Sequence, residues 1–134
     1  MKNLKSLSSA NTIFTGQVVN VADYLVNSDF FVSASFSEGM PNAALEALRC
    51  GLPCFLSKIP SHEELRDIVP KSAVLFDLDA TCSNLCDFLG RYSELFPSDA
   101  GSLARLYAEN LLSAKASSIN YQRHYQDILE RDDE

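Results

Sequence analysis

The sequence has 134 residues, a length that fits one domain with a core large enough to need no disulfide bonds. Its composition, 46% hydrophobic and 22% charged, is typical of a soluble globular domain. The formal net charge of −7 disfavours nucleic-acid binding, because an acidic surface repels phosphates.

Strand-like and helix-like runs alternate along the chain. The strand-like runs are short and apolar, and the longer amphipathic runs have starts and stops typical of helices. Pro41 suits the first position of one helix, and Ser61 with Glu64 forms a capping box at the start of the next. The predicted order is strand 11–16, helix 21–29, strand 30–35, helix 41–50, strand 53–57, helix 61–69, strand 73–76, and helices 81–96, 98–113 and 117–131.

This alternation predicts an α/β fold with a Rossmann-like parallel sheet of about four strands, flanked by helices. The sequence shows no linker and no internal repeat, so residues 1–134 are expected to form one domain. In an open parallel sheet, ligands bind beyond the carboxyl ends of the strands. The loop that contains residues 33–41 is predicted at that edge.

The stretch 33–53 carries the candidate ligand site. Gly39 lets the backbone approach a ligand closely, and the free N–H groups of the next helix favour a phosphate. Glu46 and Asn42 are four residues apart on the polar side of that helix, at a reach suited to sugar hydroxyls. Glu38 could hold a second polyhydroxy group. A ligand with the order ribose, diphosphate and sugar would satisfy both carboxylates, whereas the alternative is two ordinary surface glutamates.

The stretch SASFSEGMPNAALEALRCGLPCFLSKIPSHEEL resembles the sugar-nucleotide-binding motif of the group-one retaining glycosyltransferases of GT-B fold, glycosyltransferase family four. The family pattern has Ser, Glu-Gly, an apolar residue and Pro, then Glu-Ala in a helix, Gly-Leu-Pro, and a Glu in the next helix. The upstream run FTGQVVNVADYLVNSDFFVSAS is similar to the strand, helix and strand before that motif. The run SSINYQRHYQDILE resembles the closing helix, so the resemblance covers nearly the whole chain.

The resemblance implies a role for each residue of the motif. Glu38 would be the catalytic residue, which contacts the donor sugar during transfer with retention of configuration. Glu46 would bind the ribose hydroxyls. The alternative for His62 is a solvent-exposed histidine at the start of a helix. The predicted donor-binding residues are Ser37, Gly39, Met40, Pro41, Asn42, Glu46 and His62.

The resemblance also implies the ligands and the pathway. The donor substrate would be a UDP- or GDP-sugar, with no cofactor and no metal ion, and the acceptor would belong to polysaccharide or lipopolysaccharide assembly. The four cysteines are expected to be reduced thiols, most of them buried. A zinc site is the alternative, but no His flanks the cysteines.

The sequence departs from the family pattern at its start. The family's C-terminal domain begins with two further strands, one of which carries an Arg and a Lys that neutralise the donor diphosphate. Lys2 and Lys5 do not lie in that context. We therefore expect a partial C-terminal nucleotide-sugar-binding domain, incomplete at its N-terminal side, that does not catalyse transfer alone. Its open sheet edge favours self-association or a partner, such as the missing N-terminal acceptor domain.

Two other functions fit a doubly wound sheet. A phosphoacceptor receiver domain would need an exposed Asp at the end of a middle strand, but Gly16, Ser35 and Ser57 occupy the strand ends. A non-catalytic interaction subunit or remnant that keeps the fold is the second alternative. The sequence has a poor signal peptide and no apolar run of the roughly 20 residues that span a bilayer. The expected location is the cytoplasm, or the inner face of the membrane if a partner or a missing domain attaches the chain there.

Overall fold

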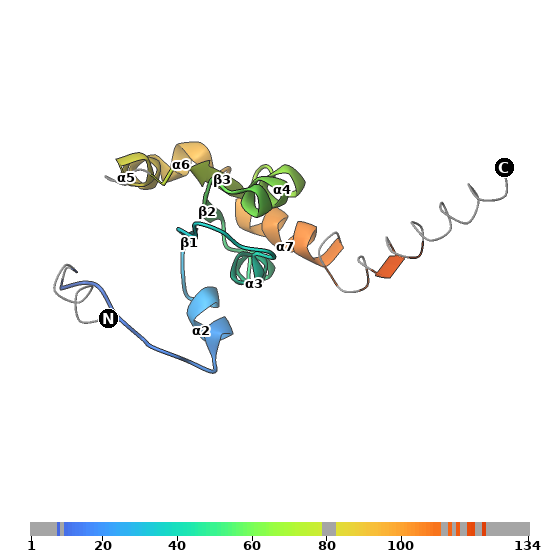
Figure 1. Cartoon of the computed structure of the whole chain (residues 1–134), viewed down its shortest axis with the longest axis horizontal. Helices are drawn as coiled ribbons and strands as arrows, with labels where there is room; N and C mark the ends of the chain where they lie inside the picture. The colour runs from blue at the N-terminus through green and yellow to red at the C-terminus, as the bar shows by residue number, and fades with distance from the viewer. Residues whose placement is uncertain are drawn as a thin grey trace.

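A parallel sheet lies at the centre of the chain, and helices flank it (Figure 1). The computed structural model describes residues 8, 10–78, 83–110, 113, 115, 118, 119 and 122. The sheet order is β1-β2-β3, and both strand pairs are parallel. The elements are α2 (Val21–Val26), β1 (Phe31–Ser33), α3 (Asn42–Arg49), β2 (Cys54–Ser57), α4 (Pro60–Ile68), β3 (Ala73–Phe76), α5 (Ser83–Gly90), α6 (Tyr92–Leu95) and α7 (Ala100–Asn110).

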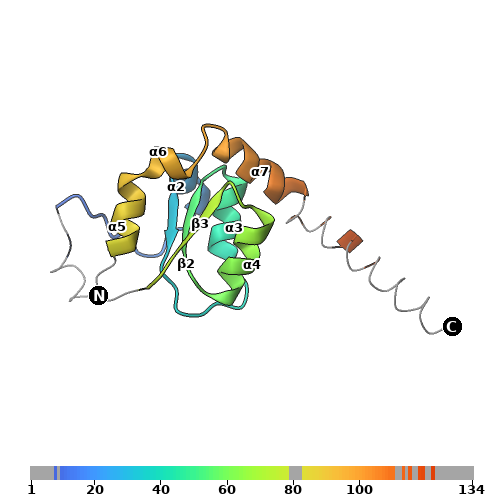
Figure 2. The same cartoon turned by 90° about the horizontal axis from the view of Figure 1, so that it is seen from above.

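The layers of the fold follow from the strand sequences. Figure 2 shows α3 and α4 on one side of the sheet and α5 and α6 on the other. Because helices cover both faces, the central strand β2 does not alternate between buried and exposed residues, and all four of its residues are buried. Its register places Phe55 between Val32 of β1 and Val74 of β3. The predicted Rossmann-like α/β arrangement is therefore confirmed.

The two faces of the sheet have different cores. On one face, small residues of α3 and α7 pack with Leu and Val side chains, and Ala47 and Ala104 are fully buried there. On the other face, Phe55 is surrounded by aromatic rings. Its ring centroid lies 5.2 Å from that of Phe96 and 5.5 Å from that of Phe30. Helix α7 closes the first core by packing along α3.

The predicted strand at 11–16 is wrong, and the described sheet has three strands where about four were expected. Residues 12–16 form no strand, and the side chain of Ile13 is 85% exposed. A strand needs a partner to accept its backbone hydrogen bonds, and this segment does not pair with β1. One edge of β1 is consequently free of strand pairing within the described residues.

The predicted helices correspond to observed helices, with corrected boundaries. Helix α4 begins at Pro60 after the N-cap residue Ile59, so the predicted capping box of Ser61 and Glu64 is wrong. A proline at the first helical position fixes φ there, and it places Ser61 one position inside the helix. Pro41 is an N-cap residue and not the first helical residue.

The C-terminal helices differ from the predicted ones within the described residues. The single helix expected at 81–96 is divided at Arg91 into α5 and α6, and the one expected at 98–113 is α7. The expected helix at 117–131 falls mostly outside the described residues, as do Lys2, Lys5 and Cys82.

Candidate functional site

Glu38 lies in the loop after β1, at the carboxyl edge of the sheet, and its own neighbours hold it there. Its side chain is 25% exposed. The Ser35 hydroxyl donates a short hydrogen bond to Glu38 Oε1, and the Ser33 hydroxyl lies 3.4 Å from the same oxygen. The two hydroxyls are 3.2 Å apart. This carboxylate is therefore oriented before any ligand arrives.

A second layer beneath Glu38 links the loop to β2 and α4. Ser57 Oγ, at the end of β2, donates a hydrogen bond of 2.6 Å to the carbonyl of Ser35. His62 on α4 is fully buried, and its Nδ1 lies 2.8 Å from the carbonyl oxygen of Ser57. The other ring nitrogen, Nε2, lies 3.7 Å from Glu38 Oε2. The interpretation of His62 as a solvent-exposed histidine at a helix start is thus wrong.

The start of α3 is open to solvent beside this cluster. No side chain among the described residues caps the helix. Asn42 and Ser37 are exposed, Met40 is 68% exposed, and Pro41 is buried. A Cβ added to Gly39 would meet no atom within 4 Å, so open space adjoins the loop at that point. Backbone N–H groups at such a helix start favour an anion.

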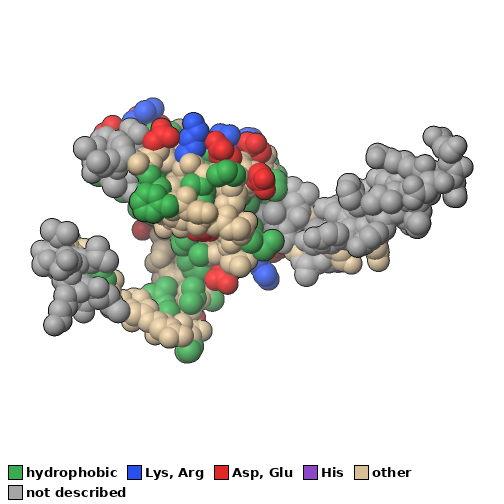
Figure 3. Space-filling model, in the orientation of Figure 1, with side chains coloured by type: hydrophobic (Ala, Val, Ile, Leu, Met, Phe, Trp, Pro, Cys, Tyr) green, Lys and Arg blue, Asp and Glu red, His purple; other side chains and the backbone are tan. Residues whose placement is uncertain are grey.

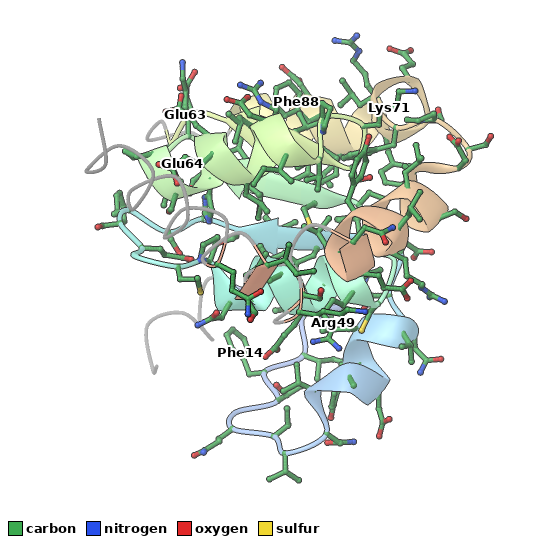
Figure 4. All side chains as sticks on the ribbon, turned by 90° about the vertical axis from the view of Figure 1, so that its right-hand side faces the viewer. Phe14, Arg49, Glu63, Glu64, Lys71 and Phe88 are labelled. Carbon is green, nitrogen blue, oxygen red and sulfur yellow. The ribbon has the colours of Figure 1, made fainter. Side chains whose placement is uncertain are left out.

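Glu46 is exposed on α3, one turn beyond Asn42, as the helical spacing predicts. It lines an open hollow of about 530 Å³ between α2 and α3. Figure 4 shows Arg49, which lines the same hollow, on the side of α3 that faces α2. The other lining residues are mostly apolar: Val19, Val21, Ala22, Leu25 and Cys50. The hollow thus combines an apolar wall with a carboxylate and a guanidinium.

The surface around α2 is apolar, whereas the opposite end of the molecule is charged. Figure 3 shows hydrophobic side chains exposed around α2, while charged side chains gather over the opposite end of the molecule. No residue of α2 is buried, and Val19, Val21 and Val26 are all exposed. This apolar surface adjoins the hollow that contains Glu46.

Neither a metal-binding cluster nor a membrane-spanning helix occurs among the described residues. No group of three or more His, Cys, Asp or Glu side chains in that part of the chain is arranged to hold a metal ion. The sequence Asp77-Leu78-Asp79 after β3 contains two acidic residues, and Asp79 lies outside the described residues. None of the described helices combines the length and apolar character needed to cross a membrane.

Sequence reasoning missed the role of Ser57 and the contacts of Ser35. Both serines follow apolar strand residues at the carboxyl ends of neighbouring parallel strands, β1 and β2. That shared position is a signal that the sequence carries, because strand ends at one edge of a sheet lie close together. The burial of His62 has no comparable signal.

Comparison with known proteins adds a family likeness. The sequence pattern of the family described as "Glycosyl transferases group 1" matches residues 1–89, a range that includes Glu38, Glu46 and His62. The chain is also similar to the putative teichuronic acid biosynthesis glycosyltransferase TuaC of Bacillus subtilis (strain 168), with 40% identity over 77 residues. That similarity covers 51% of this chain and 20% of TuaC, so the chain spans about a fifth of this relative's length.

Proposed function

Because the chain belongs to the group 1 glycosyltransferases, we propose that it binds a nucleotide-diphosphate sugar, the donor for a retaining transfer to a glycan or a lipid-linked acceptor. One observation carries this proposal. Glu38 precedes and Glu46 follows the uncapped start of α3 along the chain, and we propose that the two carboxylates flank one anion-binding position there. That order suits a sugar, a diphosphate and a ribose in turn.

Glu46 would bind the ribose. A carboxylate can accept hydrogen bonds from two neighbouring ribose hydroxyls, as acidic residues do in dinucleotide-binding folds. The hollow beside Glu46 has apolar walls from Val19, Val21 and Leu25, which offer a surface for a nucleobase. The volume of about 530 Å³ is within the range of small-molecule sites.

The start of α3 would hold the diphosphate. The macrodipole of a helix places partial positive charge at its first turn. The exposed residues Gly39, Met40 and Asn42 would line the diphosphate and the sugar together with Ser37 and Pro41. Additional positive charge is needed to stabilise the leaving diphosphate, and we propose that another part of the enzyme or a partner supplies it.

Glu38 would contact the donor sugar and act as the catalytic residue. Its carboxylate is partly exposed, and Ser35 already orients it. Preorganised charge of this kind stabilises charge that develops in a transition state. The predicted contact between His62 and the donor stays a prediction, but the imidazole is fully buried behind Glu38, which favours an effect through Glu38 over direct contact.

The activity of a whole enzyme is a further proposal, because the chain spans about a fifth of TuaC. The name of TuaC refers to teichuronic acid biosynthesis, and we propose that this chain likewise serves polysaccharide assembly in the cytoplasm. The acceptor would be bound by a separate N-terminal domain or a partner chain. On this view the described domain binds donor and does not catalyse transfer alone.

Calorimetric titration with UDP- and GDP-sugars tests the proposal. We expect binding heat with one donor class, and at least about tenfold weaker binding in Glu46→Gln, because a charged hydrogen-bond acceptor is lost. Glu109→Gln is the matched control, since Glu109 is an exposed helical glutamate on α7 that lines a different hollow, beside Gly51. Equal affinities of Glu46→Gln and wild type would overturn the ribose assignment. No heat with any donor would overturn donor binding by this chain.

The exposed apolar surface around α2 supports a second candidate, a non-catalytic interaction subunit. It adjoins β1, whose outer edge is unpaired within the described residues. Sedimentation at increasing protein concentration would test this alternative. A monomer at all concentrations would count against self-association through this surface.

A further inference from the structure

We propose that His62 is a positioning residue for Glu38, which it holds through a hydrogen bond from Nε2–H to the carboxylate oxygen Oε2. His62 is fully buried, yet no atom of the described residues forms a hydrogen bond with its Nε2. A buried polar atom without a partner is uncommon and costs free energy. The nearest carboxylate oxygen is Glu38 Oε2, at 3.7 Å.

The protons of the cluster can be assigned from its acceptors. Ser57 Oγ lies 2.6 Å from the Ser35 carbonyl, which can only accept, so the Ser57 hydroxyl proton is used there. His62 Nδ1 lies 2.8 Å from the Ser57 carbonyl, which also only accepts, so Nδ1 carries a proton. The backbone of β2 therefore fixes a proton on Nδ1.

Nε2 then needs a second proton to interact favourably with Glu38. In a neutral ring with Nδ1–H, the Nε2 lone pair would face an anionic oxygen, and two acceptors repel each other. In the imidazolium form, Nε2–H points to a carboxylate and gains a charge-assisted hydrogen bond. Glu38 provides the one carboxylate within 4 Å of a His62 ring nitrogen among the described residues.

The separation is compatible with such a bond after a small movement. Charge-assisted N–H···O bonds are about 2.7 to 2.9 Å long, so Glu38 must approach by less than about 1 Å. Glu38 lies on a loop and is partly exposed, whereas His62 is fixed in α4. The carboxylate would then be held at both oxygens, Oε1 by Ser35 and Oε2 by His62.

This arrangement deepens the proposed function and rests on it for its consequence. Each carboxylate oxygen keeps a lone pair for a sugar hydroxyl, but the plane of the carboxylate is fixed. His62 would therefore affect donor binding through Glu38 and without touching the donor. Such a residue belongs to the supporting layer that orients a catalytic group.

NMR of chains labelled with ¹⁵N-histidine tests the pairing without any donor. We expect proton signals on both ring nitrogens of His62 in the wild type, and a signal on Nδ1 alone in Glu38→Gln under the same conditions. The Gln amide can donate to a neutral Nε2, so that variant keeps the geometry without the second proton. His62→Gln identifies the signals against those of His124. An unprotonated Nε2 in the wild type, or protonation that is unchanged in Glu38→Gln, would overturn the pairing.

Donor titration tests the positioning role with two matched variants. The amide of Asn can replace Nδ1 and keep the bond to Ser57, whereas the amide of Gln can replace Nε2 and keep the bond to Glu38. We expect about tenfold weaker binding in His62→Asn and a smaller loss in His62→Gln. In a Glu38→Gln background, His62→Asn should cause no further loss, because the two residues act together.

If His62→Asn weakened donor binding as much in the Glu38→Gln background as in the wild type, the positioning role would be overturned. His62 would then have a structural role alone. Failure of the wild type to bind any donor would overturn the proposed function, while the NMR result would still decide the pairing of His62 with Glu38. The two failures are therefore distinguishable.

Discussion

Gly101 of α7 lies directly against the backbone of Gly51, the residue after the C-cap of α3. A Cβ placed on Gly101 would lie 2.6 Å from the carbonyl oxygen of Gly51. Gly51 has φ of +83°, the left-handed conformation that glycine adopts most readily at the end of a helix. Arg105 of α7 donates a hydrogen bond of 3.1 Å to the carbonyl of Cys50 at the same helix end. The C-terminal end of α3 is thus fixed by α7.

Gly101→Ala should destabilise the domain by about 1 to 3 kcal/mol, because backbone must shift to admit the methyl group. Urea unfolding followed by circular dichroism measures the change. Gly90→Ala is the matched control, since a Cβ at Gly90, at the end of α5, would meet no atom within 4 Å. Equal stability of the two variants would contradict the close contact.

Phe55→Ala should lower the free energy of unfolding by about 3 to 5 kcal/mol, because it leaves a cavity among the surrounding rings. Phe55 is fully buried, with Phe30, Phe88, Tyr92 and Phe96 around it. Phe36→Ala removes the same atoms from a residue that is 88% exposed and should change stability by less than about 0.5 kcal/mol. Thermal unfolding of both variants would show whether the aromatic cluster is a true core.

Ser57→Ala should loosen the loop that carries Glu38. It removes the hydrogen bond to the Ser35 carbonyl and leaves that acceptor without its partner, at a cost of about 1 to 3 kcal/mol. Hydrogen exchange should become faster at residues 34–41 and remain unchanged in β3. Ser102→Ala, at an exposed position on α7, is the control and should change neither segment. Unchanged exchange in the loop would contradict the role of Ser57.

Cys54 should resist alkylation in the folded protein, while the exposed Cys86 reacts. Burial raises the pKa of the Cys54 thiol from 9.0 to about 12, so little reactive thiolate forms. Its sulfur lies 3.4 Å from the Leu52 carbonyl, to which it can donate a weak hydrogen bond. Mass spectrometry after treatment with iodoacetamide would locate the label. Comparable labelling of Cys54 and Cys86 in folded protein would contradict this burial.

The raised pKa of Cys54 also predicts a change of stability with pH. The folded thiol binds its proton more tightly than the unfolded thiol, whose pKa is 9.0. The contribution of Cys54 is therefore fully present below pH 9.0 and is lost as pH rises from there toward about 12. Cys54→Ala should reduce this alkaline loss, and urea unfolding at several pH values would detect the difference.

The sequence predicted elements well where local signals are strong. Strands β2 and β3 were predicted to within one residue, because each is a short apolar run between polar or turn-forming residues. Gly51 marked the end of α3 correctly. The strand at 11–16 failed because pairing depends on a distant partner, which no local pattern reports.

The candidate site was predictable only where its residues lie within one element or one loop. Helical spacing correctly placed Glu46 on the polar side of α3, and the loop position of Glu38 left it partly exposed. The contacts of Ser57 with Ser35 and of His62 with Glu38 join elements that are far apart in sequence. Such contacts follow from packing, and spacing within one element does not specify them.

The packing of α7 has a consequence for how this family's domains are divided. The match of this chain to the family ends at residue 89, yet Ala104 and Ala108 of α7 are buried against the apolar side of α3. Ser72, before β3, donates a buried hydrogen bond of 2.9 Å to the carbonyl of Ala100. A gene segment cut at the pattern's boundary would leave this side of α3 in water and invite aggregation. The smallest unit that folds alone is therefore longer than the stretch by which the family is recognised.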